Sequence, residues 1–297
     1  MEKLNHKDLL AAGVHFGHLR KKWNPRMLPN IFMEEKGIHI IDLNRTLESL
    51  EESAAALRSI ARSGKKILFV ATKKQAKEIV TQAANRVNMP YVTERWLGGM
   101  LTNFQTIRKS IKKMQSIEKM MTDGTFESIT KKERLMLERE KAKLEKVLGG
   151  IAQLGRLPAA LFIVDIMNEH IALAEAKRLN IPTIAMVDTN SDPTSVDFAI
   201  PANDDATKSI AIITNYLTDA VVEGLADRQK DKEENAEGGE EEESGDRKPA
   251  FADVEAVSEE GGEKKRAPRG GGRGGNRGGG GSRGSNRTGG GNRTPRA

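Results

Sequence analysis

The sequence has no cysteine among its 297 residues, and aromatic residues make up only 4% of it. The absence of cysteine excludes disulfide bonds, thiolate zinc sites and cysteine nucleophiles. No apolar run approaches the roughly 18 residues of a membrane span, and the opening residues, MEKLNHKDLL, contain no hydrophobic signal core. We therefore expect a soluble, cytoplasmic protein.

Motifs of common enzyme classes are also missing. No G-x-G-x-x-G follows an expected strand, and neither G-x-x-x-x-G-K-[ST] nor H-E-x-x-H occurs. GGSRG at 280–284 matches the G-x-S-x-G nucleophile motif, but no strand or helix is expected around it. The motifs therefore give no support to an enzyme.

Charge divides the chain into unlike regions. Residues 1–226 hold 33 Lys and Arg against 27 Asp and Glu, together with nearly all the long apolar segments. Residues 227–263 hold 5 basic and 15 acidic residues, and residues 264–297 hold 10 basic residues and no acidic one. Because neither of these last two segments has enough apolar surface to offset the entropy of ordering, we expect both to be disordered.

The first 226 residues are polarised as well. Residues 1–160 hold 30 basic and 17 acidic side chains, whereas residues 161–226 hold 3 and 10. A split of this size suggests one face for a polyanion and another face for a different partner. Scattered, solvated charge is the alternative.

Short apolar runs alternate with segments of helical period, which is the pattern of an α/β protein with a parallel sheet. The expected strands are GIHIID (37–42), KILFVAT (66–72), ALFIVD (160–165) and IPTIAMVDT (181–189), with PYVTE and DFAI as weaker candidates. Near-continuous apolar strands such as ILFV suit a sheet that helices cover on both faces. The last helix is expected to end near residue 222.

Residues 104–150 interrupt the alternation. Apolar residues recur at helical spacing from Ile107 to Ile117, TDGTF then turns the chain, and TKKE at 130–133 has the form of a capping box that opens a second helix. We expect a protruding antiparallel helical hairpin, a coiled coil with a basic outer face. That face favours a polyanion contact, and a solvated face with interspersed glutamates is the alternative.

These patterns predict four parts of the chain. They are an α/β globular domain (1–103 and 151–226), a helical hairpin insertion (104–150), an acidic disordered linker (227–263) and a basic, Arg-Gly-rich disordered tail (264–297). The Arg-Gly tail fits sequence-tolerant RNA binding, and a merely soluble tail is the alternative.

Two stretches combine basic residues with tryptophan, as nucleic-acid binders often do. GVHFGHLRKKWNP (13–25) holds an Arg-Lys-Lys run before Trp23, and Arg95 precedes Trp96. Either ring could stack on a base, or it could lie partly buried in the core. TKK at 72–74 lies where a strand runs into a helix, so backbone N–H groups and two lysines could hold an RNA phosphate.

Carboxylates collect where expected strands end. Asp165 and Asp188 each end a strand, and Asp204 and Asp205 open the last helix. If they meet near His18, one imidazole and the carboxylates of Asp188, Asp204 and Asp205 could hold a structural Zn or Mg ion. Each aspartate could instead cap a turn or a helix, and no cofactor is required.

Longer strings resemble one known family. AGVHFGHLRKKWNPRM, LFVATKKQAKEIV, YVTERWLGGMLTNFQTIRKSI and VDFAIPANDDATKSI are similar to the bacterial ribosomal protein S2 family of the small (30S) subunit. RWLGGMLTNF, VDTNSDP and IPANDD are the most specific of these strings. The resemblance covers about residues 5–225 and does not extend to the acidic and Arg-Gly segments.

The resemblance implies a flavodoxin-like sheet, no catalytic activity, and a place on the rRNA of the small subunit. It also implies contact with ribosomal protein S1, which recruits mRNA, and with other small-subunit proteins. His18, Asp188, Asp204 and Asp205 belong to the family's pattern too. The positions that would face RNA are Arg20, Lys21, Lys22, Trp23, Asn24, Arg26, Lys73, Lys74, Arg95, Trp96, Asn103, Arg108, Lys109, Lys112, Lys113, Lys131 and Lys132.

Two other functions are alternatives at this point. One is an α/β enzyme that uses the strand-end carboxylates on a nucleotide or a sugar phosphate. The other is a free RNA chaperone that acts through the Arg-Gly tail.

Overall fold

The computed structural model describes residues 4–123 and 130–242. The predicted tail at 264–297 lies outside the described residues, as does the part of the predicted linker after residue 242.

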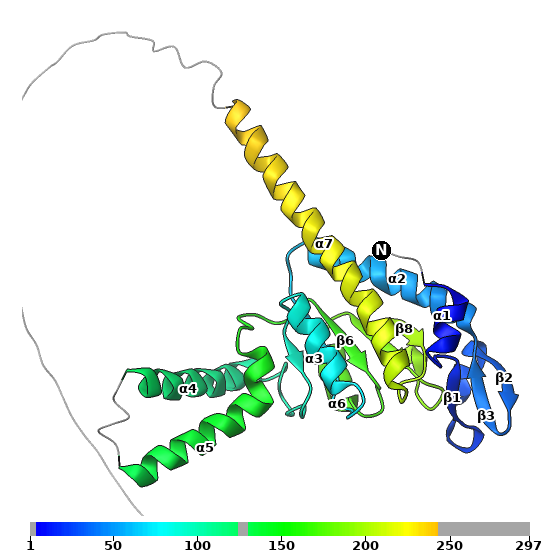
Figure 1. Ribbon diagram of the computed structural model, residues 1–297, viewed down its shortest axis with the longest axis horizontal. Helices are drawn as coiled ribbons and strands as arrows, with labels where there is room; N and C mark the ends of the chain where they lie inside the picture. The colour runs from blue at the N-terminus through cyan, green and yellow to red at the C-terminus, as the bar shows by residue number, and fades with distance from the viewer. Residues whose placement is uncertain (1–3, 124–129, 243–297) are drawn as a thin grey trace, which may run out of the picture. The chain divides into compact units, whose positions relative to one another are not determined.

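A five-stranded parallel sheet flanked by helices organises the described chain (Figure 1). Its strand order is β5-β4-β6-β7-β8, which becomes 2-1-3-4-5 when counted from β4, the order of flavodoxin-like folds. The predicted α/β fold with a parallel sheet is therefore confirmed, including both weaker strand candidates. The strands are β4 (Ile67–Val70), β5 (Tyr91–Val92), β6 (Ala160–Val164), β7 (Thr183–Val187) and β8 (Phe198–Pro201).

Both faces of the sheet are buried, as the near-continuous apolar strands require. Alternate residues of each strand point to opposite faces, so Phe69 packs with Phe162 on one side while Leu68 and Leu161 lie on the other. The first face is covered by α1 (His6–Ala11), α2 (Leu43–Arg62), α3 (Lys77–Arg86) and α7 (Thr207–Glu242). The second is covered by α6 (His170–Arg178) and the sheet-proximal ends of α4 (Phe104–Thr122) and α5 (Lys131–Leu148).

The N-terminal segment forms a second, antiparallel sheet that the sequence did not predict. Its order is β1 (Phe16–Leu19), β3 (Ile38–Ile41) and β2 (Ile31–Glu35). The prediction of a strand at 37–42 was right, but its assignment to the parallel sheet was wrong. Lys36 and Gly37 have φ values of 51° and 78°, and this left-handed turn folds β3 back onto β2 as a hairpin.

Helices α4 and α5 lie against each other. Ion pairs Lys113–Glu140 and Lys141–Glu118 cross between them, and the Thr130 hydroxyl accepts a hydrogen bond from Glu133 N at the start of α5. The expected turn at residues 124–129 lies outside the described residues, so the hairpin and its coiled coil stay predictions.

Helix α7 is longer than expected. It continues to Glu242, past residue 227, where the sequence predicted disorder to begin. Arg58 on α2 binds Asp227 through Nε and Nη2, and Arg62 binds Asp231 in the same way. The first aspartates of the acidic segment therefore pair with α2, and this pairing carries the helix beyond the predicted boundary.

Candidate nucleic-acid interface and strand-end cluster

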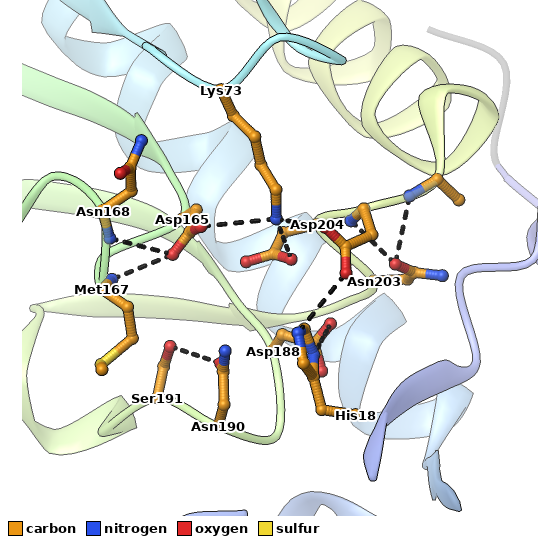
Figure 2. Close-up of polar contacts among 12 residues, drawn as sticks. His18, Lys73, Asp165, Met167, Asn168, Asp188, Asn190, Ser191, Asn203 and Asp204 are labelled. Carbon is orange, nitrogen blue, oxygen red and sulfur yellow. Dashed lines mark hydrogen bonds and ion pairs between the residues drawn. The ribbon is translucent and has the colours of Figure 1, made fainter. Parts of the chain in front are cut away.

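Acidic side chains converge at the carboxyl ends of the parallel strands, beside the point between β4 and β6 where the strand order reverses (Figure 2). Asp165 follows β6, Asp188 follows β7, and Asp204 lies between β8 and α7. Asp188 is 1% exposed and Asp204 is 0% exposed. Ligands of flavodoxin-like sheets bind at this place, so the cluster lies where a binding site is expected.

His18 reaches this cluster from β1 of the N-terminal sheet. The backbone N–H of His18 donates to Thr189 Oγ1 at 2.8 Å, and Asn24 N donates to Thr189 O at 2.8 Å. The two bonds hold residues 18–24 against the loop that follows β7. The predicted meeting of His18 with carboxylates far away in the sequence thus occurs.

The imidazole of His18 lies between two carboxylates. Its Nδ1 is 3.0 Å from Asp188 Oδ2, and its Nε2 is 3.4 Å from Asp205 Oδ2. The hydrogen bond with Asp188 raises the pKa of His18 above its usual value, and burial only partly opposes this. One ligand atom from each of His18, Asp188 and Asp204 lies within 4.8 Å of the others, as a shared metal ion requires.

Lys73 neutralises the other side of the cluster. Its Nζ is 2.7 Å from Asp204 Oδ1, 2.6 Å from Asp205 Oδ1 and 3.4 Å from Asp165 Oδ2. Burial alone would lower the pKa of Lys73, but these carboxylates hold it above its usual value. The sequence assigned Lys73 to RNA; the structure instead turns its ammonium inward, and only Lys74 beside it is exposed.

Asp204 is the most strongly perturbed group of the cluster. Burial, and then the charges of Asp165 and Asp188, raise the pKa of Asp204 to about 7 in spite of its bond with Lys73. Its Oδ2 atom is buried without a hydrogen-bond partner. Burying such an atom costs free energy, because the carboxylate oxygen loses its hydrogen bonds to water and gains none from a protein donor.

Gly17 lets β1 approach this cluster. A Cβ atom there would lie 2.6 Å from Thr189 Cγ2 and 3.0 Å from His39 O. Gly17→Ala should therefore push β1 away from Thr189 and lower the free energy of unfolding by about 1–3 kcal/mol, as overpacking does. Urea denaturation measures this, with Gly98→Ala as control, because a Cβ at Gly98 meets nothing within 4 Å. Equal stability of the two variants would contradict the close approach.

A second buried carboxylate organises the loop between β5 and α4. Glu175 on α6 accepts hydrogen bonds from Trp96 Nε1 at 3.1 Å and from the backbone N–H groups of Gly99, Leu101 and Thr102 at 2.7, 2.9 and 3.0 Å. The Thr102 hydroxyl adds a fifth bond at 3.2 Å. The structure thus places Trp96, 7% exposed, in the core, where its ring cannot stack on a base.

Sequence reasoning missed the role of Glu175, although a signal was present. On α6 the residue lies among Ala172, Leu173 and Ala176, all buried. A glutamate on the apolar face of a helix needs buried donors, because an ionised carboxylate is not buried alone.

The basic stretch after β1 is exposed. The side chains of Arg20 and Arg26 are 70% and 64% exposed, although each reaches one carboxylate, and Lys21 and Lys22 are exposed too. Trp23 is half-buried, with its ring centroid 5.2 Å from that of His39. Asn24 accepts a hydrogen bond from Arg26 N and so starts the short helix η2 (Pro25–Asn30).

The other predicted RNA-facing residues lie in the loop between β5 and α4 and on the helices α4 and α5. Arg95 and Asn103 are exposed in the loop, and Asn103 Oδ1 accepts a hydrogen bond from the Thr106 hydroxyl. Lys113 pairs with Glu140, so its charge is partly compensated. The other residues of the two helices that were predicted to face RNA are all exposed: Arg108, Lys109, Lys112, Lys131 and Lys132.

Half of the acidic residues of the segment 161–226 are buried. Of the 10 in residues 161–226, five are buried: Asp165, Glu169, Glu175, Asp188 and Asp204. The charge split of the sequence therefore separates mostly exposed bases from acids of which half are buried. It does not by itself create an acidic face.

Comparison with known proteins identifies the fold's family. The family model described as "Ribosomal protein S2" matches residues 9–224. The chain belongs to the ribosomal protein S2 family. "Small ribosomal subunit protein uS2" of Cytophaga hutchinsonii is 65% identical to it over 78% of this chain and 92% of that protein. The proteins of the same name from Flavobacterium johnsoniae and Bacteroides thetaiotaomicron are 63% and 59% identical, over 79% and 78% of this chain and 92% and 84% of their own lengths.

Membership of the S2 family decides the broad function. The chain is a structural constituent of the small ribosomal subunit of the cytoplasmic ribosome and acts in translation; it is not an enzyme. The enzyme alternative is therefore rejected. No helix within residues 4–123 and 130–242 combines the length and apolarity that crossing a membrane would take.

Proposed function

We propose that the chain binds small-subunit rRNA through exposed bases of the stretch 20–26, Arg95, Lys74 and the two helices α4 and α5. The observation that supports this proposal is that most basic side chains are exposed, whereas several acidic side chains are buried. Most bases of residues 1–160 stand in solvent, whereas five of the 10 acids of residues 161–226 are buried. A polyanion approaching the surface therefore meets more positive charge than the sequence total of +6 indicates.

Contacts with phosphates should dominate this binding. Flexible Lys and Arg side chains neutralise phosphates without reading sequence, and A-form RNA hides the base edges of its major groove. Trp23, half-buried beside the basic run, is the one ring in the basic stretch 20–26 and the remaining candidate for stacking on a base.

The double variant Lys21→Glu/Lys22→Glu should weaken binding to small-subunit rRNA by at least about tenfold and reduce the salt dependence of binding by roughly two units of slope. Filter binding across a salt series measures both quantities. Lys177→Glu/Lys208→Glu is the matched control, because it makes the same charge change at exposed lysines of α6 and α7 outside the proposed surface.

Two results would contradict this assignment. One is an equal loss of affinity in both double variants, since net charge alone would then explain binding. The other is a loss of subunit incorporation when only residues 243–297 are deleted, which would favour the chaperone function of the tail. We expect the protein that lacks residues 243–297 to co-sediment with small subunits.

We also propose that the chain supports docking of ribosomal protein S1. The family resemblance suggests this partner, and exposed apolar side chains of the N-terminal sheet region offer a surface: Leu19, Leu28 and Phe32 are 52%, 63% and 69% exposed. Leu28→Ser/Phe32→Ser should reduce S1 retained on purified small subunits. Leu157→Ser/Val222→Ser, also at exposed apolar positions, should not.

A further inference from the structure

We propose that Trp23 and His39 bind one unpaired nucleotide of RNA, with its base stacked on the indole of Trp23 and its phosphate or ribose hydroxyl hydrogen-bonded to the imidazole of His39. This inference rests on the proposed function, because the nucleotide belongs to the RNA that the basic stretch 20–26 contacts. It adds to that function a class of ligand, the unpaired nucleotide, and a residue of β3 that lies outside the basic stretch.

The imidazole of His39 has an unusual environment. The residue is 7% exposed, and both of its ring nitrogens are buried without a hydrogen-bond partner in the described part of the chain. A neutral imidazole carries one N–H donor and one acceptor, so both groups are unsatisfied here. Burying them costs free energy that an apolar side chain of similar shape would avoid. A histidine at this position therefore points to a partner that reaches the ring when the protein is bound.

The indole of Trp23 covers this imidazole. The two ring centroids are 5.2 Å apart, and the ring planes are inclined at 44°. Trp23 follows the short helix η1 (Arg20–Lys22), so the contact joins the basic stretch to the N-terminal sheet. The next residue is held by the bond from Asn24 N to Thr189 O at 2.8 Å. Because side chains move between staggered rotamers, the indole can leave His39 while the backbone stays in place.

Exposed cations beside the ring pair favour an anionic ligand. The side chain of Arg20 is 70% exposed, and Lys21 and Lys22 are exposed as well. Such groups bind phosphates, whereas an aromatic face binds a base. An aromatic face, a ring that donates a hydrogen bond and a cationic rim thus match the base, the ribose and the phosphate of a nucleotide.

The geometry of RNA requires this nucleotide to be unpaired. Within an A-form helix each base stacks on its neighbours and presents only its edges, so its face does not reach a side chain. Bases in loops and bulges can be splayed out and stacked on aromatic side chains. We therefore expect Trp23 to select loops or bulges, while the neighbouring lysines contact phosphates of any RNA.

Binding would exchange one ring contact for another. The indole of Trp23 leaves His39 and stacks on the base, so the ring contact that is lost is replaced. His39 at the same time becomes open to the RNA and gains a partner for an N–H group that had none. The free chain therefore keeps the pair closed, and RNA opens it.

Tryptophan fluorescence of the full chain tests the stacking. The sequence holds two tryptophans, and Trp96 is buried and bonded to Glu175, so only Trp23 can reach a base. A short single-stranded RNA of mixed sequence should quench the emission strongly, whereas the duplex of this RNA with its complement should quench it little. Trp23→Phe should abolish the quenching, because only the shielded emission of Trp96 remains.

Affinity for the same single-stranded RNA tests each residue. Trp23→Ala should weaken binding roughly tenfold or more, as the loss of one stacked base does. His39→Phe keeps a ring but removes both nitrogens, and it should weaken binding at least about fivefold. A residue that only packs the sheet would leave RNA affinity unchanged in this variant. His39→Gln keeps a donor and should bind RNA more tightly than His39→Phe.

Two matched variants are the controls. Phe32→Ala removes a ring of β2 that is 69% exposed, and His170→Phe removes an exposed imidazole of α6. Both should bind the single-stranded RNA as the wild type does. Circular dichroism checks that each variant is folded, and the fluorescence of the wild type tests the stacking without any variant.

Three outcomes would overturn the proposal. They are equal quenching by the single strand and the duplex, unchanged affinity in Trp23→Ala, and unchanged affinity in folded His39→Phe. Failure of the proposed function looks different, because Lys21→Glu/Lys22→Glu would then bind rRNA as tightly as the wild type. If the lysines matter for affinity while Trp23 and His39 do not, the proposed function stands and this inference is wrong.

Discussion

Replacing Glu175 with alanine should lower the free energy of unfolding by about 3–5 kcal/mol, which corresponds to roughly 10 °C in melting temperature for a body of this size. The carboxylate accepts five hydrogen bonds from the loop 96–102, and four of them come from the Trp96 indole and three backbone N–H groups. Alanine leaves these donors buried without a partner. Urea or thermal denaturation measures the change.

The charge of Glu175 should also make the stability of the fold depend on pH. Burial alone would raise the pKa of Glu175, but bonds from Thr102, Leu101, Trp96 and Gly99 more than offset it and hold the pKa below its usual 4.5. A carboxyl group whose folded pKa is depressed stabilises the fold above its unfolded pKa and loses this contribution as pH falls through the folded value. The wild type should therefore lose more stability than Glu175→Gln on acidification below 4.5.

Glu52→Ala is the control for both measurements, because Glu52 is an exposed glutamate of α2. It should change stability by less than about 0.5 kcal/mol. A similar small effect for Glu175→Ala would show that the loop 96–102 does not depend on this carboxylate.

Lys73→Met should cost about 2–4 kcal/mol of stability, since removing one partner of a buried ion pair leaves the other charges uncompensated. The side chain of Lys73 is 16% exposed, and it bonds to Asp204, which is fully buried. Asp205 is 53% exposed, so water can replace the ammonium group of Lys73 there. The loss of stability should therefore come mainly from Asp204 and Asp165. Chemical denaturation at neutral pH measures this effect.

Lys74→Met separates this internal role from RNA binding. The side chain of Lys74 is exposed, so replacing it should leave the free energy of unfolding within about 0.5 kcal/mol of the wild type. The substitution should instead lower the affinity for rRNA. The reverse pattern, with Lys73 important for RNA and neutral for stability, would restore the assignment of Lys73 to the RNA surface.

The strand-end cluster could be predicted because its logic is topological. Parallel strands that end in Asp165 and Asp188 must place these residues at one edge of the sheet, and flavodoxin-like order brings the loop with Asp204 beside them. The direction of Lys73 could not be predicted in the same way. Two adjacent lysines look alike in a sequence, and only the position of the carboxylates decides which of them turns inward.

The N-terminal sheet and the end of α7 escaped prediction for different reasons. Short strands β1 and β2 are mostly exposed, so they lack the apolar pattern that marked β4 and β6. The acidic segment after residue 226 looked unable to fold on composition alone. Its first aspartates, however, meet arginines 169 positions earlier, and no local pattern reveals such a pairing.

The bond between His18 N and Thr189 Oγ1 joins residues 171 positions apart, and this has a consequence for the chain during its own synthesis. At roughly 5–20 residues per second, about 9–34 s pass between the appearance of the two residues. The basic stretch is therefore synthesised early, whereas Thr189, which bonds to His18 and Asn24, is synthesised late. For that interval the N-terminal segment of a newborn chain lacks its hydrogen-bond partner at Thr189, so the Arg-Lys-Lys run is among the last parts of the body to be fixed in place.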